Sequence, residues 1–275
     1  MAFIKEIKYD GIYLHHSLTE HPNPENTSFK AHFHDRYELY YFISGSGYMA
    51  VEGNRYNLTG GDYFLMMPGE THSMHIDFSV PYERYAVLFK KEIFKNELSD
   101  ILLHLERDIG NICICHDDET FVKNALQNIL ESGSTSGRAS AICNLAAVLD
   151  RCKRKNDISE LSEISANELV RDMIRYINHH ISEPWNLDSL AKEFYHDKAY
   201  LCRCFKEEMG IGIWNYTLKK RVICSRQNMF LQNSVAAGFA SSGFTDYTAY
   251  YRQYKALFHM SPSEDLKEYR NQNPR

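Results

Sequence analysis

Four residues near the N-terminus have the types and the spacing of a metal or ligand site. His32 and His34 are one residue apart, Glu38 follows His34 by four positions, and His72 comes three positions after Gly69. Because residues i and i+2 of a strand face the same side, we expect the first two histidines to converge and a neighbouring strand to bring the third opposite them. Imidazoles and a carboxylate in such an arrangement suit zinc, nickel, iron or manganese.

The same spacing resembles the two motifs of the cupin family. It matches over two segments, which read HFHDRYELYYFISG and PGETH. The resemblance implies a β-barrel with the three histidines and the glutamate in its mouth. The second segment departs from the usual motif, with Pro-Gly in place of Pro-x-Gly and His75 where an asparagine is usual. Three interpretations stay open: a divalent metal site for zinc or nickel, a small-molecule pocket without metal, or histidines hydrogen-bonded to Glu38 or to the backbone.

The elements that must position these residues have the pattern of short antiparallel strands. Apolar and aromatic stretches separated by Gly-rich turns predict strands at residues 12–14, 37–44, 48–52, 55–58, 63–67, 72–78 and 85–89. Evenly spaced short strands of this kind are typical of a sandwich or barrel. Several aromatic residues in or near them could line a sugar-binding pocket or simply form the core: Tyr9, Tyr13, Tyr40, Phe42, Tyr48 and Tyr63.

A connecting region follows the strands. We expect a helix over 90–109, a strand over 111–115 and two helices over 118–132 and 136–155. One stripe of the last helix carries Ile142, Leu145, Ala146 and Leu149, which suits either packing on the barrel or a dimer surface. Polar residues then indicate a linker. The predicted domains are a barrel at 1–110, a helical connection at 111–155, a linker at 156–165 and a helical domain at 166–275.

The helical domain contains an internal repeat with a spacing of 49 residues. Asp197, Arg203, Phe205 and Lys206 recur as the residues Asp246, Arg252, Tyr254 and Lys255. A short apolar segment and a turn precede each copy, so the cap, the arginine, the aromatic residue and the lysine return in step. A helix, a tight turn and a second helix that exposes an arginine form the helix-turn-helix pattern, whose second helix enters the DNA major groove.

Caps and stops predict the helix boundaries of this domain. We expect a helix over 166–181, a short helix after the N-cap Asn186, a recognition helix after Asp197 and a long joining helix over 213–230. Gly212 stands at the start of the joining helix, where a Ser or Thr cap is usual. In the second unit the close-packed pair before the turn reads Gly238-Phe239 or Phe239-Ala240, and a phenylalanine at the tight position would push the helices apart.

The exposed faces of the two recognition helices carry the candidate DNA contacts. Arginine and lysine side chains there can donate to guanine O6 and N7 or to phosphate. The alternative for each arginine is a solvated surface charge or an ion pair within the protein. The candidates are Lys198, Ala199, Cys202, Arg203 and Lys206 in the first helix, and Tyr247, Thr248, Arg252 and Lys255 in the second.

Three segments of this domain resemble the AraC/XylS family of transcription regulators: LDSLAKEF, YLCRCFKEEMG and GFTDYTAYYRQYKALFHMSPSE. The resemblance implies two helix-turn-helix units joined by one long helix, a sensor barrel that holds an effector, dimerisation, contact with RNA polymerase and, usually, activation. In that family the histidine and glutamate pattern commonly persists without a functional metal. The predicted fold class is therefore a two-domain α+β protein, a cupin or jelly-roll barrel followed by an all-α domain.

Composition and charge fit this organisation. The chain has 275 residues, 44% of them hydrophobic, and a net charge of −5. From residue 165 onward there are 15 Lys and Arg against 12 Asp and Glu, or +3, while residues 1–164 carry 16 against 24, or −8. Only the second half therefore suits phosphate. The sequence MAFIKEIKYDGIYL lacks the apolar run of a signal peptide, and seven cysteines without a framework spacing suit a reducing compartment, so we expect a cytoplasmic protein with no membrane span.

The prediction is a one-component, sequence-specific DNA-binding regulator, without enzymatic activity and with no required cofactor, whose barrel binds a small effector such as a sugar. The rival hypothesis is a metal-dependent cupin oxygenase or isomerase that uses His32, His34, Glu38 and His72 as ligands. Against it, beyond these four residues we find no additional paired carboxylate or lysine near the motifs with an obvious catalytic role. A third hypothesis is a regulator that has lost its effector site and responds to a protein partner.

Overall fold

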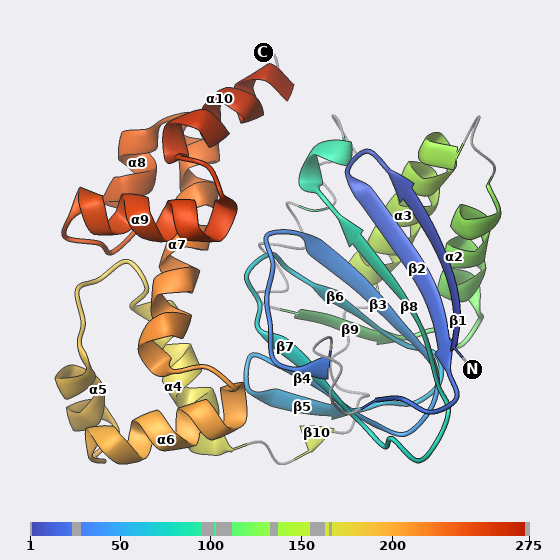
Figure 1. Cartoon of the computed structure of the whole chain (residues 1–275), viewed down its shortest axis with the longest axis horizontal. Helices are drawn as coiled ribbons and strands as arrows, with labels where there is room; N and C mark the ends of the chain where they lie inside the picture. Colours follow the sequence, from blue (N-terminus) through green and yellow to red (C-terminus); the bar gives the residue numbers. More distant parts are fainter. Residues whose placement is uncertain are drawn as a thin grey trace. The chain divides into compact units, whose positions relative to one another are not determined.

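The structure is a computed structural model that describes residues 2–23, 29–94, 102, 112–132, 137–154, 163–164 and 167–272 (Figure 1). Contacts divide the chain into two compact units, the first formed by residues 1–51 and 55–164, the second by residues 165–275 with 52–54. The predicted helical connection at 111–155 falls within the first unit. No helix in the described part of the chain is long and apolar enough to cross a membrane.

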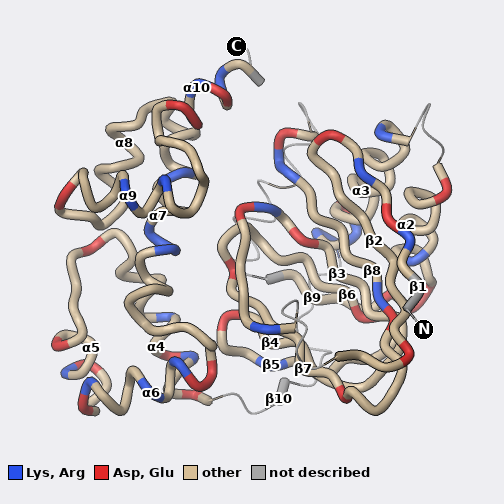
Figure 2. Tube along the Cα trace, viewed as in Figure 1, with Lys and Arg blue, Asp and Glu red and all other residues tan. Residues whose placement is uncertain are grey.

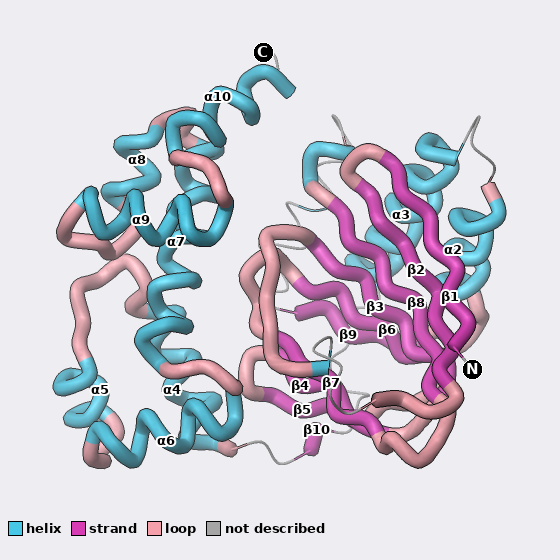
Figure 3. The backbone as a smooth tube through the Cα atoms, in the orientation of Figure 1, coloured by secondary structure: helices cyan, strands magenta, loops and turns pink. Residues whose placement is uncertain are grey.

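The first unit consists of antiparallel strands and two covering helices (Figure 3). Its strands are β1 (Ala2–Tyr9), β2 (Ile12–Thr19), β3 (Tyr37–Ser44), β4 (Gly47–Val51), β5 (Asn54–Asn57), β6 (Asp62–Met66), β7 (His72–Ile76), β8 (Tyr82–Phe89), β9 (Ile112–His116) and β10 (Glu163–Ile164). Its helices are the short 3-10 turn η2 (Lys91–Ile93), α2 (Phe121–Glu131) and α3 (Gly137–Arg154).

The strands form two sheets that face each other as in a jelly roll. One sheet has six strands in the order β1-β2-β8-β3-β6-β9, and the other has four in the order β10-β5-β4-β7. In the described residues the two sheets do not join into one closed cylinder. The predicted jelly-roll class is confirmed, and the architecture is an open sandwich rather than a closed barrel.

Alternation along β3 separates two hydrophobic layers. Leu39 and Tyr41 point to the outer face, where they pack in one cluster with residues of α2 and α3. Tyr40 and Phe42 point to the inner face, in a cluster with residues of both sheets. Burying each such side chain contributes about 1.5–3 kcal/mol, so both layers hold the sheet in place. The inner layer matters for function because Glu38 shares its face of the strand.

The strands predicted from residue 37 to residue 89 are all present, with ends that differ by a few residues. The largest difference is at β8, which begins at Tyr82 rather than at residue 85. β1 was not predicted. Its sequence AFIKEIKY leaves Ile4, Lys5, Glu6 and Lys8 exposed, because β1 is an edge strand that pairs with β2 alone.

The predicted helix over 90–109 is wrong at its start. Lys91–Ile93 form a single 3-10 turn, and Phe94 after it has extended backbone angles, φ −94° and ψ 134°. Most of the remaining residues of that prediction lie outside the described part of the chain. Helices α2 and α3 match the two predicted helices that follow strand β9.

The apolar stripe of α3 packs within its own unit. Leu145 and Leu149 are fully buried, Ala146 is 7% exposed, and Ile142 packs partly buried on the same cluster as the outer face of the sheet. Of the two roles predicted for this stripe, packing on the barrel is therefore the one that it has. A dimer would need another surface.

The second unit is entirely helical in the described residues. Its helices are α4 (Glu168–His179), α5 (Leu187–Glu193), α6 (Lys198–Met209), α7 (Ile213–Leu231), α8 (Val235–Ala240), α9 (Tyr247–Phe258) and α10 (Pro262–Gln272). Two clusters form its core, one around α4, α5 and α6 and one around α8, α9 and α10. Residues of α7 belong to both, so this helix joins the two halves.

The second half of this unit packs closely because a glycine occupies the tight position. A Cβ on Gly238 would lie 2.7 Å from Cβ of Met229 in α7. Phe239 points elsewhere and packs its ring against Tyr247 and Tyr250, at centroid distances of 5.2 and 5.5 Å. The Gly238-Phe239 alignment is therefore the correct one, and the phenylalanine does not separate the helices.

Candidate ligand site and nucleic-acid interface

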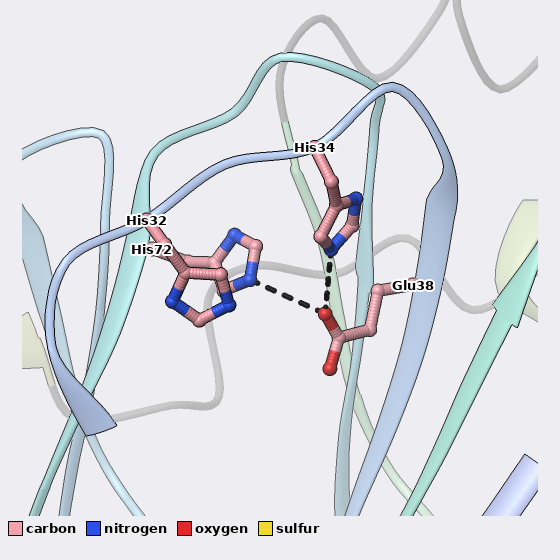
Figure 4. Close-up of side chains that lie close together, drawn as sticks. All are labelled: His32, His34, Glu38 and His72. Atoms are coloured by element: carbon pink, nitrogen blue, oxygen red, sulfur yellow. Dashed lines mark hydrogen bonds and ion pairs between the residues drawn. The ribbon is translucent and has the colours of Figure 1, made fainter. Parts of the chain in front are cut away.

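The three histidines and the glutamate meet at one point of the first unit (Figure 4). One potential ligand atom from each of His32, His34, Glu38 and His72 lies within 4.8 Å of the others. Glu38 is the second residue of β3 and His72 the first of β7. His32 forms an isolated bridge with His72, with N···O distances of 3.0 and 2.9 Å, and this bridge fixes their proximity.

The predicted convergence is present, but its predicted cause is wrong. Neither His32 nor His34 lies in a strand with regular alternation, because β3 begins only at Tyr37. His34 reaches the cluster from the loop before β3, where it lies 2.8 Å from a Glu38 carboxylate oxygen. His72 lies 3.2 Å from the same oxygen. The cluster thus depends on loop conformation as well as on the sheets.

Backbone carbonyl groups set the orientation of all three imidazoles. Nδ1 of His32 lies 2.8 Å from the carbonyl oxygen of Lys30, Nδ1 of His34 lies 2.9 Å from that of Arg36, and Nδ1 of His72 lies 3.0 Å from that of Glu70. A carbonyl oxygen only accepts, so each Nδ1 carries the proton. Nε2 of His34 and Nε2 of His72 face the Glu38 carboxylate, and a hydrogen bond from either one requires a second proton on that ring. Without that proton, Nε2 is free to bind a metal ion or to accept from a ligand. Carbonyl groups that fix the tautomer in this way are a common support of metal-binding histidines.

The electrostatics of the cluster favour a charged carboxylate. Burial alone would raise the pKa of Glu38, but hydrogen bonds from His34 and His72 outweigh burial and hold that pKa well below its usual range. Burial and the neighbouring His72 lower the pKa of His32.

The donor set fits a divalent ion. Three imidazole nitrogens and one carboxylate oxygen are ligands that zinc and nickel accept at about 2.0–2.2 Å. In a tetrahedral site such ligands lie about 3.4 Å apart, so the largest separation, up to 4.8 Å, would have to shorten by up to about 1.4 Å. The same four groups can instead hydrogen-bond the hydroxyl groups of a small molecule.

A second polar group lies on the inner face of the large sheet, and the sequence did not reveal it. Arg84 in β8 is opposite Ser17 of β2 and Phe42 of β3. Its Nη1 donates to the Tyr82 hydroxyl at 3.0 Å. Its guanidinium carbon lies 5.3, 5.8 and 6.0 Å from three aromatic ring centroids, those of Tyr82, Phe29 and Tyr40 respectively. Because the predicted strand began at residue 85, the inward position of Arg84 was missed.

The predicted pocket aromatics do not all share this face. Of the six, Tyr40 and Phe42 belong to the layer between the sheets. Tyr63 and Tyr9 pack in or against the outer layer, and Tyr48 stacks on His75 at 4.4 Å. Tyr13 lies on the same face of β2 as His15, with ring centroids 5.6 Å apart. A ligand between the sheets would therefore meet Tyr40 and Phe42 rather than Tyr9, Tyr48 and Tyr63.

The two recognition helices have matching local structure. The Asp197 carboxylate accepts from the Tyr200 backbone N–H at 2.9 Å and caps α6, while Asp246 accepts from the N–H groups of Thr248 and Ala249 at 3.2 and 2.7 Å and caps α9. The pair Leu201 and Phe205 is buried in α6, and the pair Tyr250 and Tyr254, 49 positions later, is buried in α9. The repeat therefore gives both helices the same inward face.

The predicted DNA contacts lie on the opposite face of these helices. Eight of the nine are exposed: Lys198, Ala199, Arg203, Lys206, Tyr247, Thr248, Arg252 and Lys255. Cys202 is half-buried. Two of the basic groups have neighbours inside the protein, since Lys198 forms a 2.8 Å ion pair with Asp188 and the Arg203 guanidinium lies 5.6 Å from the Tyr200 ring centroid. Figure 2 shows Lys and Arg residues in blue on α6, α7 and α9.

The known proteins that this chain resembles are regulatory proteins. Residues 15–148 match the family model of the AraC-like ligand binding domain. The Msm operon regulatory protein of Streptococcus mutans is 22% identical over 254 residues, 89% of this chain and 88% of that protein. The arabinose operon regulatory protein of Salmonella typhimurium is 25% identical over 236 residues, 83% and 82% of the two chains. Regulatory protein SoxS of Escherichia coli is 24% identical over 102 residues, 37% of this chain and 95% of SoxS.

Proposed function

The chain belongs to the AraC/XylS family of transcription regulators and carries the AraC-like ligand binding domain, and from this membership we propose how its residues perform regulation. It is a DNA-binding regulator under the control of an effector. The outward faces of α6 and α9 read DNA, and the first unit binds the effector between its two sheets. Binding shifts the population between a conformation that activates transcription and one that does not.

The repeated recognition helix carries this proposal. Arg203 and Arg252 occupy the same position of two capped helices, are exposed, and stand one turn from Lys206 and Lys255. Arginine at such a position donates two hydrogen bonds to a guanine edge, whereas the lysines suit phosphate. The mild positive charge of residues 165–275 supports a moderate, salt-sensitive affinity.

The test is a fluorescence anisotropy titration of the full chain with DNA from the region upstream of its own gene. Arg203→Ala and Arg252→Ala should each cost about 1–3 kcal/mol of specific binding. Arg138→Ala, which removes an exposed arginine from α3, is the charge-matched control and should bind normally. No preference of the wild-type protein for any promoter fragment over random duplex would refute the proposal.

The proposal also covers the effector, the oligomeric state, the contact with RNA polymerase and the location of the protein. We expect a sugar or a related small molecule as effector, a homodimer, contact with RNA polymerase, activation of transcription and residence in the cytoplasm, where the DNA is. The relative named for the arabinose operon supports the sugar. Sedimentation velocity at two protein concentrations tests the dimer. A single monomeric species at both would exclude it.

We also propose that the histidine cluster binds a metal ion. The support for this proposal is that backbone carbonyl groups fix the orientation of all three imidazoles. A divalent ion, zinc or nickel, would be held by His32, His34, Glu38 and His72 and would polarise an effector oxygen. The test is the metal content of protein purified without chelator and re-equilibrated with zinc. We expect one ion per chain in the wild type and much less in His32→Ala, while His21→Ala, an exposed histidine, is the control.

Metal analysis also separates the regulator from the rival enzyme. A metal-dependent cupin oxygenase or isomerase should contain stoichiometric metal and should show no preference for a promoter fragment over random DNA. A regulator keeps its DNA preference with or without the ion. Specific DNA binding by protein that retains no metal would therefore exclude the enzyme as the main function.

A further inference from the structure

In the part of the chain that the structure describes, one edge of the Arg84 guanidinium group has no acceptor. Nη1 donates to the Tyr82 hydroxyl at 3.0 Å. Among the described residues, Nε is buried without a hydrogen-bond acceptor, and no ion pair to the group is present. The residue as a whole keeps partial exposure, although Nε itself is buried.

This arrangement is costly for a purely structural arginine. A buried cation without a carboxylate partner loses hydration, and the aromatic faces of Phe29, Tyr40 and Tyr82 compensate only part of that loss. Buried N–H groups almost always have an acceptor. The surroundings of Arg84 therefore suit a site whose acceptor arrives from outside.

The free edge has the geometry of an anion receptor. With Nη1 committed to Tyr82, Nε and Nη2 remain as two parallel donors along one edge of the planar guanidinium group. Such an edge matches the two oxygens of a carboxylate or two oxygens of a phosphate. Phe29 and Tyr40 offer rings against which the body of the ligand can pack.

We propose that Arg84 binds the carboxylate of a small organic acid, so that the effector is an anion such as a sugar acid. This inference rests on the proposed effector-binding function of the first unit. A single guanidinium neutralises one charge, and Glu38, which contributes to the electrostatics of Arg84, disfavours a second negative charge on the ligand. A carboxylate therefore fits better than a phosphate dianion.

The experiment compares matched ligands on the full chain at constant ionic strength. D-glucuronate, D-glucose and D-glucose 6-phosphate form one set, benzoate and benzyl alcohol another. Melting temperature and titration calorimetry are measured for the wild type, for Arg84→Met and for Arg55→Met, a control that removes another arginine stacked on a tyrosine of the same unit. At ten times its Kd, a carboxylate should raise the melting temperature by about 3 °C.

The expected result has two parts. At least one carboxylate stabilises the wild type and its neutral partner does not, while Arg84→Met loses tenfold or more of that affinity. Ligand-free Arg84→Met melts at or above the wild-type temperature, because an uncompensated cation has been removed. Stronger binding of the 6-phosphate than of the carboxylate would overturn the choice of anion.

Three outcomes would overturn the site itself. One is equal stabilisation by the neutral analogues, a second is no stabilisation by any carboxylate, and a third is a fall of several degrees in ligand-free Arg84→Met that Arg55→Met does not show. The promoter titration on the same preparations separates the hypotheses. Specific DNA binding without any carboxylate effect refutes only this site, whereas carboxylate binding without DNA preference refutes the regulator.

Discussion

At the residue scale, the layer between the sheets keeps a histidine neutral beside a cation. His15 lies in β2, in the same cross-strand row as Ala86 and Tyr40, and Arg84 lies two rows away on the same face of the sheet. Burial first, and then the charge of Arg84, lower the pKa of His15 to about 4. Protonation of this side chain at mildly acidic pH therefore opposes folding of the first unit.

The sign of the resulting pH dependence follows from linkage. The pKa of His15 is near 6.5 in the unfolded chain and about 4 in the folded one, so between these pH values the unfolded chain binds more protons than the folded one. The stability that neutral His15 contributes is therefore present above about pH 6.5 and is lost as the pH falls toward 4. The loss has an upper limit of about 3 kcal/mol. His15→Gln should remove most of this slope in urea unfolding followed by circular dichroism at pH 7.5, 5.5 and 4.5.

His21→Gln serves as the control for that measurement, because His21 is exposed. Both tryptophans, Trp185 and Trp214, belong to the second unit, so their fluorescence reports that unit separately. An unchanged slope in His15→Gln would show that another group governs acid stability.

Sequence predicted which residues form the polar cluster, but not how they reach it. His32, His34, Glu38 and His72 were identified from spacing, yet the bridge between His32 and His72 and the loop position of His34 are tertiary features. Arg84 was missed because its direction depends on where β8 begins. A shift of one residue in a strand exchanges its two faces, and local composition does not fix that start.

At the element scale, α10 locks α7 and α9 together through one buried carboxylate. Asp265 is 3% exposed; one of its oxygens accepts from Arg226 Nε at 2.7 Å and from the Tyr254 hydroxyl at 2.6 Å. The charge of Asp265 thus links three helices. Removing one partner from such a pair leaves the other desolvated, which is what makes the substitution costly.

Asp265→Asn should therefore destabilise the second unit by about 2–4 kcal/mol. Tryptophan fluorescence during urea unfolding measures this directly. Glu264→Gln, the exposed neighbour on the same helix, should cost less than about 1 kcal/mol. Equal effects of the two substitutions would argue against a role of Asp265 in joining the helices.

The glycine at the α7–α8 contact gives an independent test of the second helix-turn-helix unit. In Gly238→Ala the new methyl group would clash with Met229, so we expect a loss of about 1–3 kcal/mol and weaker operator binding. Gly212→Ala is the comparison, because nothing lies within 4 Å of a Cβ there. Wild-type stability of Gly238→Ala would mean that the helices can separate without cost.

Most helices could be predicted from sequence, because their signals are local. Asn186, Asp197 and Asp246 cap the helices that they were expected to cap. The edge strand β1 and the 3-10 turn at Lys91–Ile93 were not predicted, since pairing and packing decide them rather than propensity.

At the scale of the whole molecule, the number of phosphates that the protein neutralises sets how its DNA affinity responds to salt. Each lysine–phosphate contact contributes a slope of about −0.9 to the dependence of log K on log salt concentration. Lys206→Ala and Lys255→Ala should each reduce the slope by about 1 and weaken all sequences alike, measured by anisotropy between 50 and 200 mM salt.

Lys267→Ala, an exposed lysine on α10, is the control and should leave the slope unchanged. An unchanged slope in both recognition-helix variants would mean that neither lysine meets phosphate. If a substitution weakened binding to one DNA sequence more than to others, the lysine would instead contact the bases.

The repeat within one chain has a consequence for the architecture of promoters. Helix α7 has 19 residues and is about 28 Å long, and it separates the two proposed recognition helices. Their exposed residues differ, with Lys198 and Ala199 in one, and Tyr247 and Thr248 in the other. Unlike the two halves of a palindrome, the half-sites that they recognise cannot be exchanged. The DNA site of a single chain therefore has a polarity, and inverting it in front of a gene would turn the same surface of the protein away from the start of transcription.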